Sequence, residues 1–162
     1  MVIWIVGLAG SGKTTLAKGI IKKYNKNKIV HIDGDKFRGL FDNDLGHSLK
    51  DRARNARRIS KFVGFLSKQK INIVVSVLSN FPFWLKWNRK NIKNYFEIFI
   101  DINKELLFKK NKKKLYDSKK KNVVGKDIKF NIPKNYDIKF KNTFKKKDIV
   151  NFLKSLNVKF ID

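Results

Sequence analysis

The sequence predicts an α/β fold of three layers, in which a central, mostly parallel β-sheet is flanked by helices on both faces. Short apolar runs alternate with longer Lys-rich stretches along the chain, as expected where strands and helices alternate. The first apolar run passes through a glycine-rich turn directly into a helical pattern. No internal repeat or linker interrupts the 162 residues, so we expect a single domain over residues 1–162.

The first half of the chain predicts strands over 2–6 and 29–32 and helices over 13–24 and 49–68. Residues 2–6 are continuously apolar, as expected of a strand buried within a parallel sheet. A loop rich in Gly and Asp is expected over 33–46. The long helix after this loop should begin at Ser48, because a Ser with an acidic residue three positions on matches the pattern of a helix N-cap.

The second half predicts strands over 71–78, 95–100 and 158–161 and helices over 83–93, 105–116 and 147–156. The run 71–78 is almost wholly apolar, which favours a central strand. Residues 128–144 contain Pro133 and show no clear periodicity, so they are expected to be irregular.

Composition bounds the function before any motif is considered. Of 39 basic residues, 33 are Lys and six are Arg, against 13 Asp and Glu, and the formal net charge is +26. So much positive charge attracts polyanions, and nucleic acid is the first candidate. The excess of Lys over Arg weakens that reading, because base-edge and bidentate phosphate recognition favour Arg. A coding sequence rich in A/T would yield the same mixture, so nucleic acid is not the expected partner.

Several other classes are excluded or disfavoured. No apolar run approaches the ~20 residues that a membrane helix requires. The N-terminus lacks the pattern of a secretory signal, so we expect a soluble, cytoplasmic protein. Without cysteine, the chain has no disulfide, thiolate metal site or Cys nucleophile.

Residues 7–14 (G-L-A-G-S-G-K-T) match the pattern G-x-x-x-x-G-K-[ST] in full, between a predicted strand and a predicted helix. Such glycines let backbone N–H groups turn onto a β-phosphate, and the helix N-terminus adds its dipole. Lys13 should bridge the β- and γ-phosphates as a catalytic residue, and the Thr14 hydroxyl should bind Mg²⁺. The residues predicted to bind the phosphates are Gly7, Leu8, Ala9, Gly10, Ser11, Gly12, Lys13, Thr14 and Thr15.

This motif predicts ATP or GTP binding and a sandwich of the P-loop NTPase type. No N-K-x-D guanine motif is evident and the chain is short for a motor or transport ATPase, so a small P-loop kinase is favoured.

Asp33-Gly34-Asp35 ends the second predicted strand, and Arg38 follows three residues later. Carboxylates at this edge of a parallel sheet face the γ-phosphate, where Asp33 can hold Mg²⁺ or accept a proton from an attacking hydroxyl. Arg38 can fix an anionic group of the acceptor. The alternative is an Asx-type turn beside a surface Arg.

The next segments carry a family resemblance. Residues 43–48 (N-D-L-G-H-S), 51–52 (D-R) and 55–59 (N-A-R-R-I) resemble the adenylylsulfate kinase pattern N-x-D-L-G-F-S-x-x-D-R-x-x-N-x-R-R-I. Residues 95–101 are similar to its Y-x-E-V-F-V-D strand, and Gly125, Asp127, Phe130 and Pro133 to its G-x-D-x-x-Y-x-x-P segment. The resemblance spans nearly the whole chain.

It implies an ATP- and Mg²⁺-dependent kinase that phosphorylates the ribose 3′-hydroxyl of a small nucleotide, with Asp33 as base or hydroxyl-orienting residue. The implied acceptor-binding residues are Asp35, Arg38, His47, Arg52, Asn55, Ser79 and Val123, and Lys110 would lie over the ATP phosphates. For Arg52 the alternative is a solvated helix surface. Members of this family are often dimers, so a homodimer is one expectation.

The sequence departs from the family where the acceptor would bind. The family holds the acceptor's adenine between two Phe side chains, and this chain has His47 and Val123 instead. Lys110 replaces an Arg, and residues 78–82 lack the Arg of the I-S-P-Y-R segment. These changes favour a different acceptor, and the opening M-V-I-W-I-V-G-L-A-G-S-G-K-T resembles the branch of cytidine diphosphoramidate kinases from bacterial capsule pathways.

Three alternatives stay open. One is an adenylylsulfate kinase of sulfate assimilation. Another, favoured by the charge, is a nucleic-acid-binding NTPase or polynucleotide kinase. The third is a relative that binds nucleotide without turnover.

Overall fold

The computed structural model describes residues 1–25, 28–78, 81–110, 116 and 121–160. Within these residues, five strands form one sheet in the order β2-β3-β1-β4-β5, and every neighbouring pair is parallel. The strands are β1 (Val2–Val6), β2 (Ile29–Asp33), β3 (Asn72–Val77), β4 (Tyr95–Asp101) and β5 (Ile138–Lys141). The predicted α/β class is confirmed.

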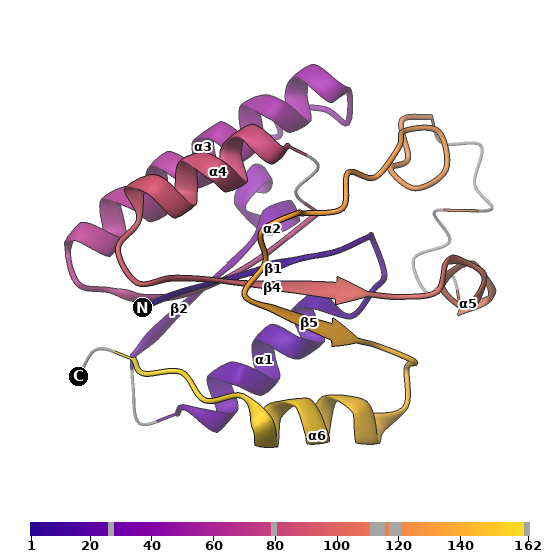
Figure 1. Ribbon diagram of the computed structural model, residues 1–162. Coiled ribbons are helices and arrows are strands. Elements are labelled where there is room, and N and C mark those ends of the chain that lie inside the picture. Colours follow the sequence, from indigo (N-terminus) through magenta and orange to yellow (C-terminus); the bar gives the residue numbers. More distant parts are fainter. Residues whose placement is uncertain (26–27, 79–80, 111–115, 117–120, 161–162) are drawn as a thin grey trace.

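Helices cover both faces of the sheet, as Figure 1 shows. They are α1 (Lys13–Lys23), α2 (Gly34–Gly39), α3 (Leu49–Lys68), α4 (Pro82–Asn91), α5 (Lys104–Lys110) and α6 (Lys146–Ser155). Because side chains alternate along a strand, Val2, Trp4 and Val6 of β1 pack towards α3 and α4. Ile3 and Ile5 pack instead against α1 and α6. The predicted three layers are therefore present, with β1 at their centre.

Two short elements were expected to be irregular. Residues 34–39 form α2, although a loop was predicted over 33–46, because the Asp33 carboxylate accepts hydrogen bonds from the backbone N–H groups of Asp35 and Lys36 and caps the helix. Residues 138–141 form β5, although 128–144 were predicted to be irregular, because Phe140 is buried and the edge of β4 offers pairing.

The last predicted strand is wrong over 158–160, which are not in a strand. Val158 packs into the apolar layer beside α1 and α6 instead. The helix predicted over 105–116 ends at Lys110, and residues 111–115 lie outside the described residues.

The parallel topology brings the motifs together at one edge. Asp33 at the end of β2 is in register with Ser76 of β3, and Val6, which precedes the glycine-rich turn, is in register with Val77. The carboxyl ends of β1, β2 and β3 therefore share the edge where such sheets bind ligands. None of the helices described is long and apolar enough to cross a membrane.

Candidate active site

A cleft of about 1040 Å³ opens at this carboxyl edge. Of the residues singled out from the sequence, those lining it are Ala9, Gly10, Gly12, Lys13, Thr14, Thr15, Asp33, Asp35, Arg38, His47, Arg52, Asn55 and Val123. The structure thus gathers both predicted sets, phosphate-binding and acceptor-binding, around one cavity.

Four predicted residues are not among the lining residues, and a fifth is not described. Gly7, Leu8 and Ser11 lie behind the surface of the loop, and Ser11 is fully buried. Lys110 is exposed at the last residue of α5. Ser79 lies outside the described residues.

The glycine-rich loop is held open by backbone geometry. Gly10 and Gly12 have φ of 77° and 94°, which L side chains rarely adopt, and a Cβ on Gly12 would lie 2.8 Å from Asn142 Nδ2. Lys13 Nζ donates to the carbonyl of Leu8 at 2.7 Å, so its ammonium group lies across the loop. Helix α1 begins at Lys13 without a side-chain cap, which leaves its first N–H groups available to an anion.

Two distant side chains fix the loop from outside. Tyr116 Oη donates to the carbonyl of Ala9 at 2.8 Å, and Asn142 Nδ2, next to the end of β5, donates to the carbonyl of Ser11 at 2.7 Å. With these carbonyls bonded outwards, the loop can present its N–H groups to the cleft. That arrangement suits a nucleotide phosphate.

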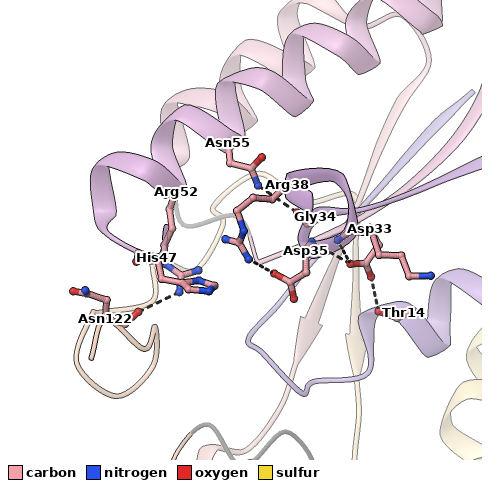
Figure 2. Close-up of polar contacts among 10 residues, drawn as sticks. Thr14, Asp33, Gly34, Asp35, Arg38, His47, Arg52, Asn55 and Asn122 are labelled. Carbon is pink, nitrogen blue, oxygen red and sulfur yellow. Dashed lines mark hydrogen bonds and ion pairs between the residues drawn. The ribbon is translucent and has the colours of Figure 1, made fainter. Parts of the chain in front are cut away.

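Asp33 lies opposite this loop and is held by four hydrogen bonds. Its Oδ2 accepts from Thr14 Oγ1 at 2.9 Å, as Figure 2 shows, and from Ser76 Oγ at 3.2 Å. Its Oδ1 accepts from the backbone N–H groups of Asp35 and Lys36. Burial alone would raise the pKa of Asp33, but these hydrogen bonds outweigh it and hold the pKa below its ordinary value. Asp33 is therefore an oriented carboxylate at neutral pH.

Thr14 is also suited to a cation. Because its hydroxyl proton points to Asp33, the oxygen lone pairs remain for a metal ion. Among the described residues, no group of three or more His, Cys, Asp or Glu could hold a metal. A Mg²⁺ ion here would take Thr14, phosphate oxygens and water as ligands, the usual arrangement when Mg²⁺ is bound with a nucleotide.

A second row of polar groups supports Asp33 and was not singled out from the sequence. His31 Nε2 lies 3.0 Å from Ser76 Oγ, and Ser76 in turn donates to Asp33. Burial lowers the pKa of His31, which favours the neutral imidazole. A neutral His31 with its proton on Nε2 would complete a chain of donors that ends on the Asp33 carboxylate.

Two arginines from different helices occupy the acceptor side. Arg38 of α2 is only 8% exposed and pairs with Asp35 at 2.9 Å. Arg52 of α3 donates to the carbonyl of His47 at 2.9 Å and to that of Asn122 at 3.1 Å (Figure 2). Burial, and then the positive charge of Arg38, lowers the pKa of Arg52, although an arginine stays protonated. A buried and a partly buried cation in one cleft favour an anionic ligand.

Some lining residues were missed by sequence reasoning. At the nucleotide side they are Asn142, Phe144, Lys145, Lys146, Ile149 and Val150, around the start of α6. Behind the acceptor side they are Trp4, Ser60, Ser76, Phe81 and Trp84. The first group stands in a Lys-rich stretch like the rest of this basic chain, and the second follows ordinary core patterns. Neither group therefore has a sequence pattern of its own that would mark it as part of a binding site.

Comparison with known proteins places the cleft in context. The family model for adenylylsulphate kinase matches residues 1–141. A cytidine diphosphoramidate kinase of Campylobacter jejuni is 37% identical over 142 residues, which cover 82% of this chain and 81% of that protein. An adenylyl-sulfate kinase of Buchnera aphidicola is 38% identical over 120 residues, covering 72% of this chain and 58% of that protein.

Solved structures agree in fold. The Mycobacterium tuberculosis APS kinase CysC in complex with AMPPNP and APS superimposes with a TM-score of 0.80 at 26% identity, covering 95% of this chain and 97% of that one. The crystal structure of APE1195 gives a TM-score of 0.81 at 21% identity, over 95% of this chain and 93% of that one.

Proposed function

Because the chain belongs to the adenylylsulfate kinase family, we propose that it transfers the γ-phosphate of ATP to the ribose 3′-hydroxyl of cytidine diphosphoramidate. The observation that carries the proposal is one cleft with two chemically distinct sides. The glycine-rich loop and Lys13 form the nucleotide side, and Asp33, Arg38 and Arg52 form the acceptor side.

On the nucleotide side, the loop N–H groups and the dipole of α1 bind the ATP phosphates, and Lys13 neutralises charge on the transferred group. Mg²⁺, held through Thr14, would supply further neutralisation at the β- and γ-phosphates. The residues therefore stabilise charge rather than form covalent intermediates.

On the acceptor side, Asp33 orients the 3′-hydroxyl towards the γ-phosphorus. A new O–P bond forms from this hydroxyl, the bond between the γ-phosphorus and the bridging oxygen breaks, and ADP leaves. Because its hydrogen bonds keep Asp33 ionised, it is a weak base that accepts the hydroxyl proton late, as suits a loose transition state. Arg38 and Arg52 bind the acceptor's diphosphate.

The choice of a cytidine acceptor rests on the similarity to the Campylobacter jejuni enzyme and on two positions at the cleft. His47 and Val123 line it where the family pattern has Phe. Loss of stacking on an aromatic side chain costs about 1–3 kcal/mol per base, and Val123 offers no aromatic face. A smaller pyrimidine depends less on such a double platform than adenine does.

The test is a panel of acceptors with Mg-ATP, in which ADP release is followed with cytidine diphosphoramidate, CDP, adenylyl sulfate and an oligonucleotide. We expect turnover to be fastest with cytidine diphosphoramidate. Fast turnover with adenylyl sulfate and none with the cytidine compounds would overturn the acceptor. Asp33→Ala should abolish transfer while ATP still binds, and surviving turnover would remove the proposed role of Asp33.

Adenylyl sulfate is the second candidate acceptor, because the adenylyl-sulfate kinase of Buchnera aphidicola is as similar in identity as the Campylobacter jejuni enzyme. The same panel decides between them.

A further inference from the structure

The acceptor side of the cleft has two walls that come from distant parts of the chain. His47 and the start of α3 form the first wall, and residues 121–124 form the second, and both walls line the cleft. Arg52 and Asn122, one from each wall, are 70 residues apart in the sequence. The covalent chain therefore does not fix the distance between the walls, which depends on noncovalent contacts.

The first wall is fixed on α3 by polar contacts on either side of His47. Ser48 Oγ accepts from the N–H of Asp51 at 3.1 Å and caps the helix. Arg58, further along α3, donates to both carboxylate oxygens of Asp44, at 3.0 and 2.8 Å. The chain that leads to His47 is thus tied to the helix before and after this residue.

The second wall is a compact turn. The N–H of Val123 donates to Asp127 Oδ2 at 3.0 Å, and the N–H of Asp127 donates to the carbonyl of Val123 at 2.8 Å. Val123 and Val124 are buried in an apolar cluster with Leu8, Leu107 and Tyr116. Each wall is therefore well held in itself, and their separation is the variable that a contact across the cleft can set.

The side chain of Arg52 makes such a contact. Its Nε donates to the carbonyl of His47 at 2.9 Å, and its Nη2 donates to the carbonyl of Asn122 at 3.1 Å. In Figure 2, Arg52 extends from α3 towards Asn122, with His47 beside it. Both acceptors are backbone carbonyls, and that of Asn122 belongs to the peptide bond before Val123. The guanidinium therefore holds the main chain of both walls.

We propose that Arg52 is a positioning residue that fixes the separation of the two walls and thereby selects the base of the acceptor. The guanidinium is planar and its N–H groups point in fixed directions, so two simultaneous bonds define one distance between the walls. A base between the walls meets the guanidinium on a third side, which limits its size. This inference rests on the proposed function, because it assumes that the acceptor's base lies between His47 and Val123.

This role is compatible with binding the acceptor's diphosphate. An arginine has five N–H donors, and the bonds to His47 and Asn122 use two of them. Arg52 is only partly buried and lines the cleft, so its remaining donors can reach an anionic group. Loss of Arg52 should thus weaken every anionic acceptor, and its effect on the choice of base has to be measured as a ratio.

The experiment measures turnover of cytidine diphosphoramidate and adenosine diphosphoramidate with Mg-ATP. The two compounds carry the same 5′ group, so contacts with this group cancel in the ratio of their kcat/KM values. In Arg52→Gln, the shorter amide cannot reach both carbonyls. We expect both kcat/KM values to fall and the preference for one base to fall roughly ten-fold, the order of one hydrogen bond to a charged group.

Two outcomes of this comparison would overturn the proposal. One is an equal fall for both acceptors with an unchanged ratio, because Arg52 would then serve the diphosphate alone. The other is a wild type that does not distinguish the two bases.

Arg52→Lys separates charge from geometry. Lysine keeps the positive charge but carries one nitrogen in place of the fork. We expect Arg52→Lys to recover part of kcat/KM for both acceptors, while the preference for one base stays reduced. Wild-type preference in this variant would show that the fork is not needed and would contradict the proposal.

Arg54→Gln is the matched control. Arg54 is exposed on the same helix and does not line the cleft, so this variant removes an equal charge without touching the walls. Both kcat/KM values and their ratio should stay at wild-type values. A ratio that changes as much as in Arg52→Gln would assign the effect to net charge and overturn the proposal.

The same data separate this inference from the proposed function. If the wild type prefers the adenosine compound and Arg52→Gln loses that preference, the cytidine acceptor is wrong and the role of Arg52 is upheld. If the wild type prefers the cytidine compound and Arg52→Gln keeps that preference, the proposed function stands and the role of Arg52 is overturned.

Discussion

At the scale of single residues, the hydrogen bond from Ser76 to Asp33 should be visible in the pH dependence of the reaction. This bond stabilises the carboxylate, so Ser76→Ala should raise the pKa of Asp33. If Asp33 must be ionised, the acidic limb of the kcat/KM profile moves to higher pH, by roughly half to one unit for one hydrogen bond. If the acidic limb does not move in Ser76→Ala, this hydrogen bond does not set the pKa that governs the reaction.

His31 supplies the control, because burial lowers its pKa towards that of a carboxyl group and it contacts Ser76. His31→Gln keeps a side-chain donor but has no titratable group. The acidic limb should survive in this variant, and its disappearance would assign the limb to His31 instead of Asp33.

A second carboxylate, Glu97 on β4, bears on stability rather than on the reaction. It is 2% exposed, and burial raises its pKa from 4.5 to about 7, although the Tyr95 hydroxyl and Arg89 oppose the shift. Because the folded state binds this proton more tightly than the unfolded chain, the stabilisation is full below pH 4.5 and is lost as pH rises towards and through 7.

Glu97→Gln should therefore flatten this part of the stability profile. Between about pH 5 and 8, the free energy of unfolding of the wild type should fall, relative to the variant, by up to about 3 kcal/mol. Urea denaturation of both proteins at both pH values measures this free energy. Subtracting the values for the variant from those for the wild type removes the contributions of the other titrating groups. Parallel profiles would show that Glu97 ionises normally.

At the scale of elements, the site depends on the connection after β5. Asn142 is buried, bonds the carbonyl of Ser11 through Nδ2 and accepts from the N–H of Phe144 through Oδ1. Asn142→Ala leaves the Ser11 carbonyl unpaired beside the phosphate loop, which should cost about 1–3 kcal/mol of stability. The affinity for ATP should fall as well, measured by calorimetry on protein that is still folded.

Asn151→Ala is a fair comparison, because Asn151 is exposed on α6 and does not line the cleft. Asn151→Ala should leave both the stability and the affinity for ATP unchanged. An Asn142→Ala variant that is destabilised but binds ATP normally would show that this contact serves the fold alone.

The elements also show which parts of the molecule a sequence reveals. The strand before the glycine-rich turn, helix α1 and the Asp33 motif were predictable, because each has a pattern within a few neighbouring residues. Helix α2 and strand β5 have six and four residues and depend on a cap and on an edge pairing. The Asn142 contact with Ser11 joins positions 131 residues apart, and no local pattern marks it.

At the scale of the whole molecule, the charge of +26 remains to be explained. The residues given a task in the cleft include few cations, chiefly Lys13, Arg38 and Arg52. Among the described residues, Arg38, Arg58, Arg89 and Lys139 form ion pairs with carboxylates. Most of the positive charge therefore lies on the surface, where it repels itself and opposes the compact state.

Salt should consequently stabilise this protein. The Debye length falls from about 10 Å at 0.1 M to about 3 Å at 1 M, so added NaCl screens the repulsion and should raise the Tm. Chloride is used because sulfate or phosphate would bind the phosphate loop and stabilise the fold by mass action. A Tm that is constant or falls with NaCl would mean that the surface charges are locally compensated.

The same titration tests the remaining alternative of a nucleic-acid enzyme. Attraction of a lysine-rich surface to an oligonucleotide is a matter of counterion release, so the affinity should fall steeply with salt and depend little on sequence or on strand ends. Turnover of the small acceptor should survive at salt concentrations that abolish oligonucleotide binding, because Arg38 is buried and Arg52 partly buried, and salt screens both less than it screens surface lysines. Salt-resistant binding to strand ends, with phosphorylation of those ends, would favour a polynucleotide kinase and give the charge a direct function.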